Sequence, residues 1–148
     1  MLIQELTRPA SLELLARAHL GRLACAQGGQ PYVVPISFVY YHDCLYSFCT
    51  VGQKIEWMRA NPLVSDEMDE IVDTRQWASV IVFGRYEELP DTPKWSIERE
   101  MAAKLLQENA MWWEPGYGKV ILQGRERTLV PLFYRIHVAQ ITGRSATP

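Results

Sequence analysis

The segment Thr50-Val51-Gly52-Gln53-Lys54 places a hydroxyl, a glycine and a lysine at the point where a helical pattern begins. The first backbone N–H groups of a helix have no partner within the helix, and with the helix dipole they favour an anion. Lys54 adds a positive charge and Thr50 a hydroxyl donor. The segment is not a Walker A loop, because the upstream glycine and the following Ser or Thr are absent. We predict a phosphate site here; the alternative is an ordinary turn with a solvated lysine.

The apolar segment that precedes this loop, residues 31–38, has a composition that suits contact with a flat ring. It reads as a strand with two prolines, which lack a backbone N–H and favour an edge position. Backbone groups facing a ring tune its electron affinity, and the candidates here are Val34, Pro35, Ile36 and Ser37. A proline-stiffened edge strand with no ligand is the alternative. Taken together, the two segments predict a site for a phosphorylated, planar cofactor.

The remaining reactive residue types form no recognisable centre. His19, His42 and His137 have no metal-ligand spacing to one another or to a cysteine. His137 lies on the mixed face of the last strand pattern and is the best histidine for a substrate or interface contact. Cys44 and Cys49 fall on opposite strand faces, which argues against a shared metal. No Gly-x-Ser-x-Gly elbow occurs, so any enzymatic reactivity is expected to come from a cofactor.

The totals describe an ordinary globular chain, and we expect a single domain over residues 1–148. The hydrophobic fraction is 48% and the charged fraction 22%, with a net charge of −2. This balance argues against a nucleic-acid surface, which needs clustered basic residues. No apolar stretch reaches the length of a membrane span, and the N-terminus lacks a signal-peptide pattern. Three cysteines without a Cys-x-x-Cys fit reduced thiols, so we expect a cytoplasmic protein that binds neither nucleic acid nor membrane.

Short turns separate most of the expected strands. Gly28-Gly29 and His42-Asp43 predict hairpin turns after strands at 22–26 and 31–41, and Asn61-Pro62 ends a helix that begins at Lys54. Residues 79–83 are apolar at nearly every position, which predicts a strand buried on both faces. The acidic run over residues 66–70 misses the calcium-loop pattern and predicts a solvated strand face. We therefore expect a mainly β fold, a six- to seven-stranded antiparallel barrel with flanking helices.

The order and spacing of several segments resemble the pyridoxamine 5'-phosphate oxidase-related flavoproteins, including a nitroimidazole-reductase-like branch. The resemblance covers roughly residues 6–144; no single motif is specific, but their order and spacing are. It rests on Gly21-Arg22-Leu23-Ala24, Pro31-Tyr32-Val33-Val34-Pro35-Ile36-Ser37-Phe38, Leu45-Tyr46-Ser47-Phe48, Gly52-x-Lys54, Asn61-Pro62 and Ser79-Val80-x-Val82-x-Gly84-x-x-Glu87.

The resemblance implies an FMN-binding split barrel that works as a homodimer with two FMN sites at the subunit interface. It places the phosphate on Thr50, Gln53 and Lys54, and the ring along the strand from Val34 to Ser37, and it brings Ser79 to the flavin. Two departures argue against oxidation of vitamin B6. The ring-binding strand carries no Lys or Arg, and the oxidase's Arg-x-His motif near the C-terminus is replaced by Ile141-Thr142-Gly143-Arg144. Gln53 stands where the authentic oxidase has an arginine, which implies weaker FMN binding or a different flavin.

The expected function is an FMN-dependent oxidoreductase that transfers two electrons to or from a small organic substrate. A non-enzymatic holder or sensor of flavin or haem is the alternative, and a cofactor-free dimeric interaction protein is a third possibility. A deazaflavin offers a similar ring and phosphate, so the sequence leaves FMN and deazaflavin both open. Trp112 and Trp113 are expected to plug the core or interface, or to cover the ring.

Overall fold

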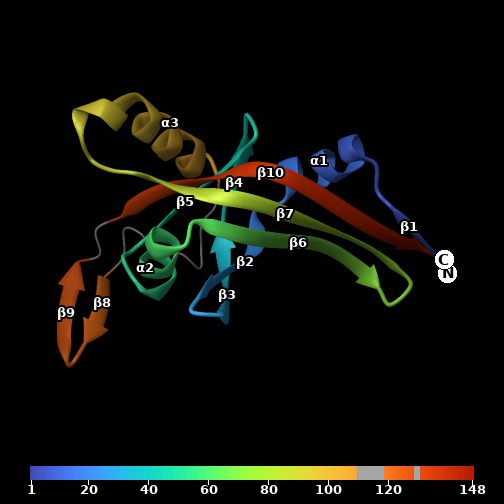
Figure 1. Ribbon diagram of the computed structural model, residues 1–148, viewed down its shortest axis with the longest axis horizontal. Coiled ribbons are helices and arrows are strands. Elements are labelled where there is room, and N and C mark those ends of the chain that lie inside the picture. Colours follow the sequence, from blue (N-terminus) through green and yellow to red (C-terminus); the bar gives the residue numbers. More distant parts are fainter. Residues whose placement is uncertain (110–118, 129–130) are drawn as a thin grey trace.

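One curved antiparallel sheet forms the body of the protein, and antiparallel turns build most of it (Figure 1). The computed structural model describes residues 1–109, 119–128 and 131–148. Seven strands follow the order β3-β2-β6-β7-β10-β5-β4, and β1 pairs with the end of β10. The strands are β1 (Leu2–Glu5), β2 (Leu20–Gln27), β3 (Gln30–Ser37), β4 (Val39–Tyr41), β5 (Cys44–Cys49), β6 (Leu63–Asp73), β7 (Gln76–Leu89) and β10 (Leu132–Thr147). The expected mainly β, antiparallel split-barrel fold is thus confirmed.

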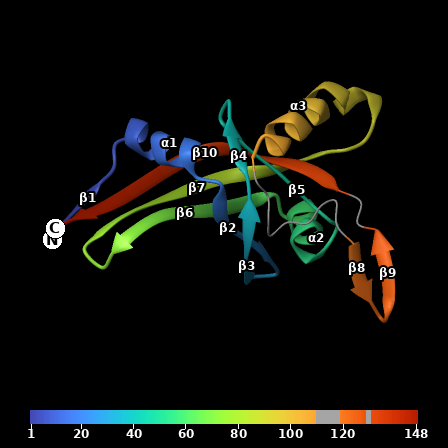
Figure 2. The ribbon, with the colours of Figure 1, turned by 180° about the vertical axis from the view of Figure 1, so that it is seen from behind.

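Helices cover this sheet at three places, and a small hairpin extends away from it (Figures 1 and 2). The helices are α1 (Arg8–Arg17), α2 (Gln53–Ala60) and α3 (Ser96–Gln107), the last entered through a 3₁₀ turn, η1 (Pro93–Trp95). The hairpin pairs β8 (Lys119–Leu122) with β9 (Arg125–Thr128). Both views show α2 and α3 on opposite sides of the sheet. None of the helices in the described ranges is long and apolar enough to cross a membrane.

The chain turns where the sequence predicts hairpins. Gly28 and Gly29 have positive φ angles of 57° and 78°, which glycine adopts without strain and which match the twist of the flanking strands. His42 and Asp43 take φ angles of 46° and 59° between β4 and β5. Asp43 fits this conformation because its side chain accepts a hydrogen bond from the Tyr40 hydroxyl at 3.1 Å, and its carbonyl accepts from the Val138 N–H at 2.9 Å.

The expected strand over residues 31–41 is two strands. The ladder stops at Phe38, whose side chain is fully buried and whose N–H donates to the His19 carbonyl at 3.1 Å. β3 and β4 therefore occupy the two edges of the sheet. Near this break the Ser47 hydroxyl of β5 donates to the Ser37 carbonyl at 2.6 Å, which ties the end of β3 to β5.

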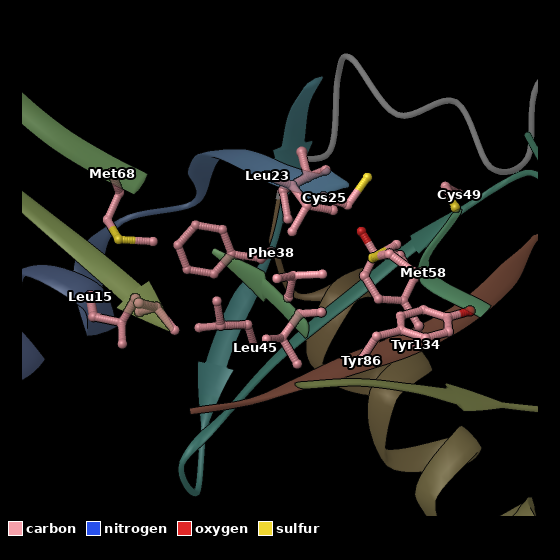
Figure 3. Packing of buried hydrophobic residues seen from close by; sticks show 14 of the residues in the cluster. Leu15, Leu23, Cys25, Phe38, Leu45, Cys49, Met58, Met68, Tyr86 and Tyr134 are labelled. Carbon is pink, nitrogen blue, oxygen red and sulfur yellow. The ribbon is translucent and has the colours of Figure 1, made fainter. Parts of the chain in front are cut away.

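The barrel interior is filled by apolar side chains from every main element. Figure 3 shows Phe38 among Leu15, Leu23, Leu45 and Met68, all of them fully buried. A second cluster lies on the other face of β5 and β10, beneath α3, and joins Phe48, Leu89, Ala102, Leu106 and Phe133 with smaller neighbours. Cys49 belongs to the first cluster and Cys44 to the second, which confirms that these thiols lie on opposite faces.

Two expectations about burial are wrong. Asp66 is fully buried, although the acidic run predicted a solvated face. It shares the inward face of β6 with Val64 and Met68, because alternate residues of a strand point the same way. Conversely, Ile81 and Phe83 of β7 are 38% and 42% exposed, so this strand is buried on one face and open on the other.

Candidate functional site

The start of α2 offers an anion its backbone donors. Gly52 is the N-cap of this eight-residue helix and makes no side-chain capping hydrogen bond. The first backbone bond within the helix runs from the Glu56 N–H to the Gly52 carbonyl at 3.1 Å. The N–H groups in the first turn of a helix have no carbonyl partner within that helix, so this end of α2 is where backbone donors can face an anion. Thr50, half-buried, precedes this turn and Gln53, exposed, opens it.

One face of α2 is packed against the β2–β3 hairpin, which brings the phosphate loop to the ring strand. Lys54 is half-buried and close enough to Cys25 of β2 that its charge opposes the rise in the thiol pKa caused by burial. One helical turn later, Trp57 contacts Tyr32 of β3 in a tilted arrangement, with ring centroids 5.5 Å apart and an interplanar angle of 55°. Beyond the helix, the Asn61 amide donates to the Ala26 carbonyl at 3.1 Å.

The ring strand β3 is an edge strand, as its prolines predict. It pairs with β2 alone, in the register Leu23↔Val34 and Leu20↔Ser37. Pro35 is exposed and Val34 half-buried, whereas Ile36 and Ser37 are buried. The Ser37 hydroxyl is enclosed and makes no hydrogen bond within the described part of the chain. Because one side of β3 has no neighbouring strand, that side is where the edge of a flat molecule could meet its backbone.

These features fit a phosphorylated flavin. The uncapped helix start and Lys54 suit a dianionic phosphate, which charge-assisted hydrogen bonds hold most strongly. The open edge of β3 lies against the same helix, so a molecule held at α2 can extend along it. Glu56 in the first turn is exposed and disfavours anions there, so Lys54 carries more of the attraction. Across the described residues, no cluster of three His, Cys, Asp or Glu side chains could hold a metal.

Ser79 lies on β7, and within the described part of the chain its contacts are with residues outside α2 and β3. Its hydroxyl donates to the Glu67 carboxylate at 3.1 Å, and it faces a hollow of about 590 Å³ that Trp77 and Arg144 also line. Ser79 pairs with Arg144 on β10, whereas Cys49, next to the phosphate loop, pairs with Leu132. Twelve residues of a strand span roughly 40 Å. Figure 1 likewise shows α2 and the β6–β7 turn at opposite ends of the molecule.

The other sequence candidates have separate positions. His137 lies on β10, within hydrogen-bond distance of Glu87 and Cys44, and does not approach α2. Trp112 and Trp113 lie outside the described residues. Sequence reasoning missed the hollow of about 430 Å³ between β2, β6, β7 and β10, which includes Leu63, Phe83 and Ala139. The sequence pattern behind this hollow is the alternation of apolar residues along the strands. That pattern can be interpreted only once the exposed face of the sheet is known.

The chain matches the family model described as pyridoxamine 5'-phosphate oxidase over residues 7–145. It belongs to this family. Members are flavin-binding proteins with a split-barrel fold, and this agrees with the sheet and the helix start described above.

Solved and curated relatives extend the comparison. A FAD-binding protein from Mesorhizobium loti is 43% identical, with a TM-score of 0.83, and the match covers 99% of this chain and 100% of that one. An uncharacterized protein, RA0666, from Rhizobium meliloti (strain 1021) is 40% identical over 99% of this chain and 97% of its own length. The haem storage protein HutZ from Vibrio cholerae shares the fold, with a TM-score of 0.60 and 17% identity over 95% of this chain and 96% of that one.

Proposed function

We propose that this protein is an FMN-dependent oxidoreductase that transfers two electrons to or from a small organic molecule. The observation that supports it most is the uncapped start of α2, with Lys54 beside it, packed against the open edge strand β3. One element holds the charge of a phosphate and the other offers backbone to a ring. The flavin supplies the two-electron chemistry, and the protein supplies binding and orientation.

In this proposal each residue of the site has a limited task. Lys54 and the N–H groups of the first turn of α2 bind the phosphate, and the Thr50 hydroxyl and Gln53 amide add donors. Val34 to Ser37 present backbone along the ring. Pro35 lacks an N–H, so it leaves any hydrogen bonds to its neighbours. The contact between Tyr32 and Trp57 holds α2 against β3, which fixes the position of the phosphate loop relative to the ring strand.

A homodimer is the second part of the proposal. In the proposed dimer the flavin lies between two copies, and it contacts Lys54 of one copy and Ser79 of the other. The outer face of the sheet supports such a contact. Leu63 is 63% exposed and Phe83 42% exposed, and both line the apolar hollow on that face. Exposed apolar patches of this kind are typical of protein–protein interfaces.

The relatives bear on the choice of cofactor. The Mesorhizobium loti protein is described as FAD-binding, and FAD carries the same isoalloxazine ring and a phosphate in the same position relative to it. The single-lysine loop suits the terminal phosphate of FMN, which has two negative charges. HutZ has the same fold and stores haem, so a non-enzymatic holder of flavin or haem is the second candidate. Consumption of a reductant by the purified protein separates the enzyme from the holder.

The experiment is a flavin titration of Lys54→Ala. A charge-assisted hydrogen bond contributes about 1.5–3 kcal/mol, so we expect the Kd for FMN to rise roughly 10- to 150-fold. Quenching of flavin fluorescence measures the affinity. Lys104→Ala is the control, because it removes an exposed lysine from α3, on the other side of the sheet. An unchanged Kd in Lys54→Ala would remove Lys54 from the site.

A further inference from the structure

Three side chains from three neighbouring strands form a hydrogen-bonded line on the outer face of the sheet. The Cys44 sulfur of β5 lies 3.4 Å from Nδ1 of His137 on β10. Nε2 of the same imidazole lies 3.0 Å from Oε1 of Glu87 on β7. Cys44 and His137 are directly opposite in the ladder, so the backbone register fixes this approach. None of these three residues belongs to α2 or β3, so they are not part of the proposed flavin site.

The carboxylate decides which imidazole nitrogen carries the proton. Burial alone would raise the pKa of Glu87, but hydrogen bonds from His137 and Arg135 outweigh it and leave the pKa below its ordinary value. An ionised carboxylate only accepts hydrogen bonds, so Nε2 of a neutral His137 must be the protonated nitrogen. Nδ1 then has a free lone pair, and it faces the thiol. This is the arrangement in which a base can take a proton from a nucleophile and a third group orients the base.

Two further groups stabilise negative charge at the sulfur. Arg135 donates through Nε to Glu87 at 2.7 Å and through Nη1 to the Tyr46 hydroxyl at 3.3 Å. Burial raises the pKa of the Cys44 thiol, while Arg135 and a hydrogen bond with Tyr46 act to lower it, and Glu87 and Asp43 act to raise it. The thiol is therefore protonated at rest. Reaction at sulfur requires that its proton leaves as the new bond forms, and His137 is the acceptor in reach.

The location admits a small reactant and excludes a large one. Cys44 is 6% exposed, whereas the side chains of His137 and Glu87 are 45% and 35% exposed. α3 covers the sheet on one side of the line. The apolar hollow that includes Gly84 and Ala139 begins next along the same strands. With so little of Cys44 exposed, a bulky thiol or peptide cannot reach the sulfur, so a reactant must be small.

We propose that Cys44 is a reactive thiol that hydrogen peroxide, or another small hydroperoxide, oxidises to a sulfenic acid, with His137 as the base and Glu87 as its positioning residue. The sulfur attacks one peroxide oxygen, forming an S–O bond as the O–O bond breaks. His137 takes the thiol proton and passes it to the leaving hydroxide, which departs as water. Sulfur is oxidised by two electrons and the peroxide is reduced by two. The proposal does not depend on a bound flavin.

The test compares the three cysteines of one folded protein. Cys25 and Cys49 are 4% and 1% exposed and lie in the interior cluster, so they serve as internal standards. The full chain is treated with hydrogen peroxide in the presence of a cyclic 1,3-dione that traps sulfenic acid, and peptide mass spectrometry follows each adduct with time. We expect Cys44 to be trapped at least tenfold faster than the other two. Equal rates, or no adduct at Cys44 in the folded protein, would overturn the proposal.

Two variants separate a base from a structural group. His137→Ala should slow trapping at Cys44 by roughly 100-fold, the lower end of the range for general-base catalysis, and added imidazole should restore part of the rate. Glu87→Gln lets an amide donate to Nε2, so the proton shifts to Nδ1; ¹⁵N NMR of His137 should report this shift, and trapping should slow. The melting temperature of each variant confirms folding. A wild-type rate in His137→Ala, or no response to imidazole, would contradict the role of His137.

Discussion

The buried carboxyl of Asp66 makes a pH-dependent loss of stability the sharpest physical prediction for this fold. Asp66 is fully buried on the inward face of β6 beside Gly21, and neither oxygen makes a hydrogen bond within the described residues. Burial raises its pKa well above the ordinary value, the Glu67 carboxylate adds to the rise, and Arg22 opposes it. The folded protein therefore keeps this group protonated at a pH where the unfolded chain has released the proton.

The sign and size follow from proton binding. An unfolded aspartate ionises at a pKa of about 3.9. Below that pH both states are protonated, and the group costs nothing extra. Above it the folded state binds more protons than the unfolded state, so stability falls by about 1.4 kcal/mol per pH unit until the folded pKa is reached. Asp66→Asn keeps the shape of the side chain and cannot ionise. Its unfolding free energy relative to the wild type should therefore rise with pH, by up to this amount per pH unit.

The assay is urea unfolding, followed by tryptophan fluorescence, at several pH values from about 3.5, near the pKa of an unfolded aspartate, to about 7. The difference in unfolding free energy between Asp66→Asn and wild type should be smallest at the acid end and increase toward neutrality. Glu100→Gln, an exposed change on α3, is the control and should stay within about 0.5 kcal/mol of wild type. Parallel curves for wild type and Asp66→Asn would refute the reasoning, because they would mean that the carboxyl ionises normally inside the barrel.

Two further predictions concern the sheet. Gly84→Ala should destabilise the protein by about 1–3 kcal/mol, the range for overpacking, because a Cβ there would lie 2.5 Å from the His137 carbonyl oxygen and 2.6 Å from Cγ2 of Ile136. Chemical denaturation measures this, and a wild-type midpoint would show that the strands can separate at no cost. Phe83→Glu should convert the proposed homodimer to monomer in sedimentation or light scattering, because it places a charge on the apolar outer face. Ile97→Glu on α3, where the isoleucine is 78% exposed, is its control, and a dimer that survives Phe83→Glu would place the interface elsewhere.

Local signals in the sequence identified the turns and the helix limits. Gly28 and Gly29 form the predicted hairpin turn, and α2 ends at Ala60, just before Asn61-Pro62. These features depend on a few adjacent residues, so the local sequence predicts them. Burial on a strand depends instead on which face meets the core. The burial predictions for the acidic run and the apolar run were both wrong for this reason. Side chains alternate between the two faces of a strand, so Asp66 points inward and Phe83 outward whatever their polarity.

The same distinction applies to the sites. The residues of the phosphate loop are adjacent in the sequence, so the sequence alone is enough to predict phosphate binding there. The Cys44–His137–Glu87 line joins residues 50 and 93 positions apart, and only the register of three strands brings them together. The position of Ser79 is also a matter of register. Its place in the flavin site stays a prediction.

The central claim is that the chain binds a phosphorylated flavin, and an absorption spectrum tests it most directly. Freshly purified protein, or protein loaded with FMN and passed through a desalting column, should show the two visible bands of an oxidised flavin. Mass spectrometry of the molecule released by denaturation should identify FMN. A single strong haem band, or a colourless protein that retains no flavin after loading, would contradict the claim.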